Sequence, residues 1–423
     1  MSRQVPSVDM QAMLRVGFAQ APIDVPPGLR MGGYTLRSGV ALGTAEPLLA
    51  TAVALWAGSR RCAVVSLDLV SVTTPVSRFL RNALSKSGFG DEDLILAATH
   101  THSGPGQAQR KLVADGLYVD DRAVADDLYY EPAALEAIER AVVHAVEAAA
   151  DAAVEAELDA ADGLIDGSAT NRVPGAATLP PTGSLVLARS TAGQLLGAIV
   201  GYAAHPTVLG EDNLYYSPDF VGPFRTMLRR QLHGVPIVFL NGASGDLSTR
   251  FTRHARTPEE NDRLGAALAA QFAPLVEAAR PIRSTPLDAS SVSFEVQARS
   301  FPPAAEIDRT LAEARAQYRR AVDAGEPAAE IRTAQNDLIG AEALAVHADS
   351  ARDRRETATL RAIRIGDLAV LGVPAELFSE LGNAIARPSQ VRDLMIATCA
   401  DGHLSYILPS QMAQNAHYEG LIS

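Results

Sequence analysis

The sequence has little cysteine and no long hydrophobic run. Its two cysteines, Cys62 and Cys399, are too few for a disulfide framework or a cysteine zinc site. Both lie in apolar runs, so we expect buried free thiols. No stretch of about 18 apolar residues is present that could cross a membrane, and the N-terminal residues lack the apolar region of a signal peptide. These absences predict a soluble, cytoplasmic protein without a transmembrane segment.

Lysine is also scarce. Only Lys86 and Lys111 are lysines among the 37 basic residues, and the others are arginines. Because alanine is abundant as well, we interpret the arginine excess as a bias of genomic base composition rather than as phosphate binding. With 49 acidic residues the net charge is −12, which makes nucleic acid an unlikely class of partner. The sequence leaves the oligomeric state open, a homo-oligomer included.

Apolar strand-like runs alternate with helical patterns along most of the chain, which predicts an α/β fold with a mixed β-sheet core flanked by helices. The spacing of apolar residues predicts a helix over 132–150, and Thr257 with Glu260 predicts a capping box at the start of another. The polar residues 163–184 predict a surface loop. Residues 303–349 are rich in Ala, Glu and Arg, which predicts an inserted helical hairpin with a solvated, charged face. We expect residues 1–423 to form one catalytic domain.

Two histidines mark the first candidate site. His100 and His102 lie in THTHSGPG, directly after the apolar run LILAA. Alternate residues of an extended chain point to one face, roughly 6.5–7 Å apart, so both imidazoles can serve one site. The glycines that follow let the backbone approach a ligand.

Three further candidates follow other apolar strands: His205 after AIVGYAA, Glu376 after LAVLGVPA, and Tyr406 after LMIATCADGHLS. Ligands of α/β proteins gather at the carboxyl ends of strands. Nitrogen and oxygen donors without a thiolate favour zinc, with iron or manganese as alternatives. The pattern therefore predicts a metal site.

These residues lie in motifs that resemble the neutral (alkaline, non-lysosomal) ceramidases and their shorter bacterial relatives. The matching stretches cover nearly the whole chain: MGGY (31–34), VVSLDL (64–69), ATHTHSGPG (98–106), NR (171–172), AAHPT (203–207), NGASGDLS (241–248), VPAE (373–376) and SYILP…YEG (405–420).

The resemblance implies hydrolysis of an amide bond with one zinc ion. The implied zinc ligands are His100, His205, Glu376 and Tyr406. The residues implied to contact the scissile amide are His102, Arg172 and Tyr418, with Gly33 lining the pocket. A zinc-bound hydroxide would attack the carbonyl, Tyr418 or Arg172 would stabilise the oxyanion, and His102 would protonate the leaving amine. We regard Asp68 and Asp246 as candidates for orienting the imidazoles, with a structural cap or turn as the alternative.

Two departures from the family concern the substrate. The chain ends just after YEG, so we expect no C-terminal immunoglobulin-like domain, and Ala45 stands where a histidine is expected near the sphingoid head group. Together with the missing secretory signal, these departures favour a soluble N-acyl compound over ceramide as the substrate.

Alternatives stay open at this point. The protein could be a true ceramidase, a metal-dependent amidohydrolase barrel, which also carries an H-x-H motif on a strand, or a non-catalytic ligand-binding relative. Ser244 and Ser248 lack the G-x-S-x-G elbow of a serine nucleophile, so we expect turn-stabilising hydroxyls. His144, His233, His254 and His347 are expected at the surface or in packing, and His417 is the exception because it adjoins Tyr418.

Overall fold

The computed structural model describes residues 13–106, 111–112, 118–119, 130–176, 181–297, 299–348, 355–413 and 417–423. Residues 177–180 of the expected surface loop and residue 349 at the end of the expected hairpin lie outside these ranges, as does the N-terminal segment 1–12. The side chain of His347 is also outside the described part.

A nine-stranded sheet forms the centre of the structure, in the order β13-β11-β10-β8-β1-β3-β4-β5, with β15 paired to β8. Most neighbours are antiparallel, but β5 lies parallel to β4 and β13 lies parallel to β11. The sheet is therefore mixed. Its strands are β1 (Arg15–Pro22), β3 (Leu49–Ala57), β4 (Arg60–Leu67), β5 (Leu94–Ala98), β8 (Val154–Leu164), β10 (Thr182–Ser190), β11 (Leu195–Tyr202), β13 (Ile237–Asn241) and β15 (Arg280–Ile282).

A second sheet of four strands covers one face of the first, in the order β16-β17-β18-β20. Apolar side chains of both sheets share one buried cluster, with Val64 and Ile95 on the large sheet and Val370 on the small one. β5, with the sequence LILAA, is apolar and buried throughout because its alternate residues enter the clusters on both faces of the sheet. The strands of the second sheet are β16 (Leu287–Gln297), β17 (Arg355–Ile365), β18 (Leu368–Gly372) and β20 (Asp393–Ala397).

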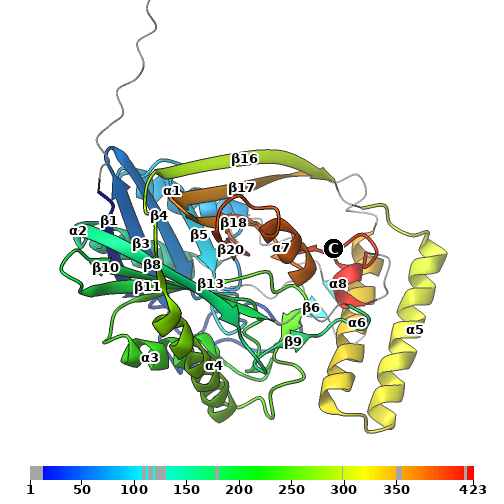
Figure 1. Cartoon of the computed structure of the whole chain (residues 1–423). Helices are drawn as coiled ribbons and strands as arrows, with labels where there is room; N and C mark the ends of the chain where they lie inside the picture. The colour runs from blue at the N-terminus through cyan, green and yellow to red at the C-terminus, as the bar shows by residue number, and fades with distance from the viewer. Residues whose placement is uncertain are drawn as a thin grey trace, which may run out of the picture.

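Helices cover the opposite face of the large sheet (Figure 1). One buried cluster joins α1 and α2 to β3, β4 and β5, and another joins α3 and α4 to β10, β11 and β13. The layers are thus helices, large sheet and small sheet. The helices are α1 (Thr74–Ser85), α2 (Pro132–Asp151), α3 (Val221–Gln231), α4 (Pro258–Ala278), α5 (Ala304–Asp323), α6 (Ala328–His347), α7 (Ser379–Ala386) and α8 (Tyr418–Leu421).

Short two-residue strands tie the connecting loops together. β9 (Thr170–Asn171) pairs with β14 (Leu247–Ser248), and β19 (Glu376–Leu377) pairs with β21 (Tyr406–Ile407). Two further ladders join β2 (Gly43–Thr44) to β12 (Tyr215–Tyr216) and β6 (Lys111–Leu112) to β7 (Tyr118–Val119).

The structure confirms the predicted α/β fold class with its mixed sheet and helical hairpin. An open mixed sheet excludes the amidohydrolase barrel, which needs parallel strands closed into a ring. Both cysteines are buried and free, as expected. Half of the capping box is present, since Thr257 accepts a hydrogen bond from the Glu260 amide at 3.3 Å, whereas the Glu260 carboxylate binds Arg263 and the His254 amide.

Two expectations about surfaces are wrong. Within the expected surface loop Arg172 and Val173 are buried, because β9 draws this segment against β14. The hairpin stands beside the sheets with α5 outermost (Figure 1), but its charges are not all solvated. Arg332 on α6 is 13% exposed, since it pairs with Glu211 and lies over the Tyr34 ring. None of the helices in the described ranges combines the length and apolar character needed to cross a bilayer.

We predict that Asp401→Ala destabilises the fold strongly. Asp401 lies between β20 and β21 and pairs with Arg81 of α1, both side chains being at most 6% exposed. It also accepts hydrogen bonds from Ser77 and the Leu96 amide. Removing it leaves the buried Arg81 guanidinium only the longer pair with the exposed Asp91, at 3.7 Å, and the loss of the buried pair costs about 3–5 kcal/mol in the free energy of unfolding.

Urea denaturation followed by circular dichroism measures this change. The matched control is Glu136→Ala, because Glu136 pairs with Arg140 in an exposed bridge worth at most about 1 kcal/mol. Equal unfolding midpoints for the two variants would contradict the role given to Asp401.

Candidate functional site

Segments far apart in the sequence bring the site residues together. His100 follows β5 and His205 follows β11, and His205 forms an isolated bridge with Ser248. Glu376 and Tyr406 are register partners in the parallel pair β19–β21, which places their side chains next to each other. The local backbone is held in an unusual conformation at His100, with φ of 69°. A left-handed conformation at a residue other than glycine stores strain and is typical of functional sites.

Backbone carbonyls orient the two imidazoles. His100 Nδ1 lies 2.6 Å from the Val70 carbonyl oxygen, and His205 Nδ1 lies 2.8 Å from the Ser244 carbonyl oxygen. Because a carbonyl only accepts, each Nδ1 carries a proton, and each ring turns its Nε2 the other way. Burial opposes a charge on His100, but Cys399 and Glu376 raise its pKa well above the usual value, so His100 Nε2 holds a proton where no other cation neutralises Glu376.

Both Nε2 atoms face the same carboxylate oxygen. Glu376 Oε2 lies 3.4 Å from His100 Nε2 and 3.1 Å from His205 Nε2. Burial and the positive Arg172 lower the pKa of His205 to about 3, so this ring is neutral at physiological pH. Burial alone would raise the pKa of Glu376, but His100 and His205 outweigh it and hold that pKa well below the usual range.

Three acceptors at this separation repel one another unless a cation or a proton lies among them. His102 adds a further nitrogen, since its Nε2 lies 3.4 Å from His100 Nε2. The ligand atoms of His100, His102 and His205 all lie within 4.8 Å of one another. This arrangement of nitrogen and oxygen donors could hold a metal ion.

Arg172 and Tyr406 form the adjoining wall. Arg172 donates to the Tyr406 hydroxyl at 2.9 Å and to the Gly245 carbonyl at 3.0 Å, and its Nε lies 2.9 Å from Glu419 Oε1. Burial and the nearby Glu376 raise the pKa of Tyr406 well above its usual range. Arg172 is therefore a buried cation in a fixed position, compensated by Glu419.

Gly33 packs directly against His102. A Cβ atom at Gly33 would lie 2.4 Å from His102 Cγ, and its φ is 93°. Only glycine combines this backbone conformation with so close an approach. The His102 backbone is also fixed, because Arg37 donates to its carbonyl oxygen at 2.7 Å.

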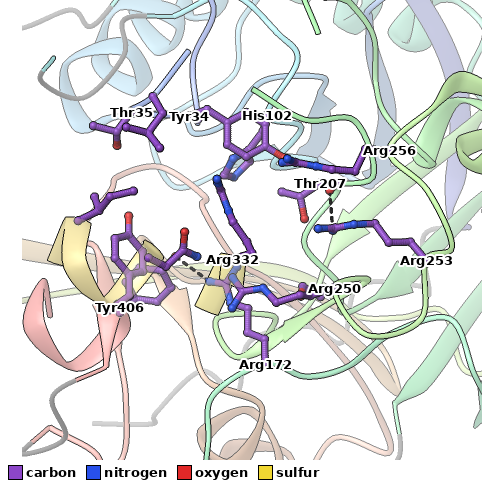
Figure 2. Close-up of a pocket in the computed structure, with 16 residues that line it drawn as sticks. Tyr34, Thr35, His102, Arg172, Thr207, Arg250, Arg253, Arg256, Arg332 and Tyr406 are labelled. Carbon is purple, nitrogen blue, oxygen red and sulfur yellow. Dashed lines mark hydrogen bonds between the residues drawn. The ribbon is translucent and has the colours of Figure 1, made fainter. Parts of the chain in front are cut away.

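A pocket opens beside His102 and collects the residues expected at the scissile amide (Figure 2). It is lined by Gly33, Tyr34, Thr35, Leu36, His102, Arg172, Thr207, Ser248, Arg250, Arg253, Arg256, Arg332, Asn336, Ile339, Tyr406 and Tyr418. The Tyr418 ring meets the Tyr406 ring edge to face, with centroids 6.0 Å apart. Ser248 Oγ accepts from the Arg250 amide at 3.2 Å, which fits a turn-stabilising hydroxyl.

The two aspartates contact groups other than the imidazoles. Asp68 accepts from the Leu49 amide and pairs with Arg225. Asp246 accepts from Ser379 through both its amide and its hydroxyl, and its carbonyl oxygen receives the Arg172 amide at 2.8 Å. Within the described residues neither carboxylate contacts a histidine, so backbone carbonyls orient the rings and Asp246 helps to position Arg172.

Sequence reasoning missed two side chains beside the ligands. Cys399 Sγ lies 3.4 Å from His100 Nδ1, the ring nitrogen turned away from Glu376. His403 Nε2 lies 3.9 Å from Glu376 Oε1. Both residues lie in the sequence CADGH (399–403), between β20 and Tyr406, and this position next to a proposed ligand could have indicated them.

Sequence reasoning also missed four of the five arginines that line the pocket, all except Arg172. Three of them, Arg250, Arg253 and Arg256, lie three residues apart just after Ser248, a spacing that could have drawn attention to them. Ala45, by contrast, is exposed and is not among the residues that line the pocket.

The family is established by comparison with known proteins. The model of the neutral/alkaline non-lysosomal ceramidase N-terminal domain matches residues 15–238, more than half of the chain. The chain belongs to this family. No curated protein sequence matches it.

Two solved structures show the same fold. The neutral ceramidase of Pseudomonas aeruginosa is 21% identical, with a TM-score of 0.72, and the match covers 97% of this chain and 71% of that one. A ceramidase complexed with C2 is 19% identical, with a TM-score of 0.71, and the match covers 97% and 72% of the two chains. Family membership supports a ceramidase-like hydrolase that acts on amide bonds, and the histidine group is compatible with a metal.

We predict that Gly33→Ala lowers kcat on an N-acyl substrate on the order of 100-fold, because a displacement of about 1 Å at a catalytic group has such an effect. The added methyl group would displace the His102 ring. The matched control is Gly28→Ala, where φ is 90° but nothing lies within 4 Å of the added Cβ.

Both variants carry the same backbone strain of about 1–2 kcal/mol, and Gly33→Ala also carries the cost of displacing the His102 ring. The thermal stability of Gly33→Ala should therefore fall at least as far as that of Gly28→Ala, and only Gly33→Ala should lose turnover. Equal kcat values for the two variants would contradict the packing role of Gly33.

Proposed function

We propose that this member of the ceramidase family is a zinc-dependent hydrolase that cleaves the amide bond of a soluble N-acyl compound. The supporting observation is that His100 and His205 both turn Nε2 toward Glu376 Oε2, at 3.4 and 3.1 Å. With Tyr406, these residues are the proposed ligands of one zinc ion. Zinc fits nitrogen and oxygen donors, and when bound it lowers the pKa of water to about 7 and so supplies hydroxide at neutral pH.

The residues around the proposed ligands take distinct roles. Arg172 and Tyr418 would bind the carbonyl oxygen and stabilise the negative charge that develops on it. His102 would pass a proton to the leaving amine. Burial and the neighbouring His100 and His205 hold the pKa of His102 well below its usual range, so His102 starts as a neutral ring, and the proton that it passes on would come from the nucleophilic water. Gly33 keeps it in place.

In this proposal the whole chain of residues 1–423 acts as one catalytic domain. The hairpin supports this view, because Arg332, Asn336 and Ile339 of α6 line the same pocket as His102. Tyr418 opens α8, and its amide donates to Asp337 of α6 at 3.0 Å. The hairpin is thus tied to a proposed catalytic residue.

We predict that His205→Ala loses its metal while keeping the fold. Removing a residue that only hydrogen-bonds to a metal ligand weakens metal binding by up to about 100-fold. Removing a direct ligand should therefore weaken it by more than that. Elemental analysis of the purified protein by mass spectrometry measures the stoichiometry and distinguishes zinc from iron and manganese. His144→Ala is the control, because His144 is exposed on α2.

Circular dichroism checks that both variants fold. Stoichiometric zinc in purified, folded His205→Ala would show the ligand assignment to be wrong.

A second prediction concerns the substrate class. The wall beside His102 carries five guanidinium groups, and a two-chain lipid gains little from a polar wall because apolar contacts stabilise it. We therefore expect kcat/KM to be at least about tenfold higher for polar N-acyl amines than for short-chain ceramide, a difference of about 1.4 kcal/mol in transition-state binding. Product formation by both substrates is measured by mass spectrometry under identical conditions. Efficient turnover of ceramide with the polar amides untouched would identify a true ceramidase instead.

A further inference from the structure

The pocket beside His102 is strongly positive although the protein is acidic. The chain has a net charge of −12, yet the residues that line this pocket include five arginines and no aspartate or glutamate. The arginines come from different elements, Arg172 after β9, Arg332 from α6 and the other three from the segment between β14 and α4. Figure 2 shows them around one space.

Carboxylates just outside the lining compensate three of these arginines. Arg172 pairs with Glu419. Arg256 and Arg332 share Glu211, with Nη2 of Arg256 2.6 Å and Nη1 of Arg332 3.1 Å from its two oxygens.

Arg250 and Arg253 are different, because no carboxylate of the described residues lies within ion-pair distance of either. Arg250 donates from Nη1 to Thr333 at 3.1 Å, and Arg253 donates to the Thr207 carbonyl at 3.0 Å. The nearby Asp219 oxygens accept backbone amides, among them those of Val208 and Leu209.

Arg250 is the more deeply buried of these two arginines on which the inference depends. It is only 8% exposed, and burial together with Arg172 lowers its pKa from the usual value to about 9. A buried cation with neutral hydrogen-bond partners alone destabilises a fold. Because Arg250 lies on the pocket wall, it can bind an incoming anion, which would supply the missing counter-charge.

We propose that the substrate carries an anionic group, a carboxylate or a phosphate, which binds to Arg250 and Arg253 while its amide lies at His102 and Tyr418. The guanidinium group suits both anions because its donors match two oxygens at once. This inference rests on the proposed function, to which it adds a substrate class. A neutral lipid would leave Arg250 buried without a counter-ion.

Two matched substrate pairs test the inference. The first pair is N-hexanoylglycine and its neutral amide, and the second is N-hexanoylethanolamine phosphate and N-hexanoylethanolamine. We expect kcat/KM to be more than about tenfold higher for the anionic member of at least one pair, consistent with one charged hydrogen bond. Whichever pair shows the preference identifies the anionic group of the substrate as a carboxylate or as a phosphate.

Variants test whether the pocket arginines cause the preference for the anionic substrate. Arg250→Gln and Arg253→Gln should each reduce it to less than about threefold, mainly through KM, and Arg250→Lys should keep part of it. The control Arg309→Gln removes the same charge from an exposed position on α5 and should leave the ratio unchanged. Circular dichroism of each variant excludes unfolding, and Arg253→Gln serves if Arg250→Gln does not fold.

Binding of uncleavable analogues separates this inference from the proposed function. In 4-oxononanoic acid and 4-oxononyl phosphate a methylene replaces the amide nitrogen of the two anionic substrates, and 4-oxononanamide is the neutral control. Calorimetric binding of an anionic analogue that Arg250→Gln abolishes supports the anion site even if no amide is cleaved. Hydrolysis of both members of each pair with equal kcat/KM, unchanged in Arg250→Gln, would overturn the inference while leaving amide hydrolysis intact.

Discussion

The close approach of His100, His205 and Glu376 is the constraint on which the rest of the site depends. Glu376 Oε2 lies 3.4 Å from His100 Nε2 and 3.1 Å from His205 Nε2, an arrangement that is unfavourable unless a proton or another cation lies among these atoms. The fold maintains it with carbonyl partners on the far side of each ring and with a strained backbone at His100. Because the three residues follow β5, β11 and β18, the two sheets must pack correctly before the site can form.

Much of this arrangement could be predicted from the sequence. Apolar runs followed at once by His100 and His205 marked strand ends, and strand ends of a mixed α/β sheet gather ligands. Glu376 and Tyr406 were found in the same way, but their pairing in β19–β21 leaves no pattern in a two-residue strand. Arg172 was placed in a surface loop because its neighbours are polar, whereas its burial depends on β14, more than 70 residues away in the chain.

The arginines show what composition conceals. A count of basic residues cannot distinguish a solvated arginine from one that the fold buries. Because arginine is abundant in this chain, no single arginine indicated a functional site by its residue type alone. Burial separates them. Arg309 on α5 is 66% exposed, whereas Arg250 is 8% exposed, although both lie in polar sequence. Non-local packing against α6, through Thr333, decides the surroundings of Arg250.

The arginines that are paired with a carboxylate and those that are not have different roles in the pocket. Arg172 is held by Glu419, Tyr406 and a backbone carbonyl, so it needs no reorganisation when charge develops on a carbonyl oxygen, the condition for stabilising a transition state. Arg250 and Arg253 lack such compensation among the described carboxylates. They favour an anion that is present before and after the reaction, and such uniform binding lowers KM rather than raising kcat. Loss of Arg172 should therefore act on kcat, and loss of Arg250 on KM. A protein with a net negative charge can thus select an anionic substrate, because the local charge of the pocket rather than the net charge determines what binds there.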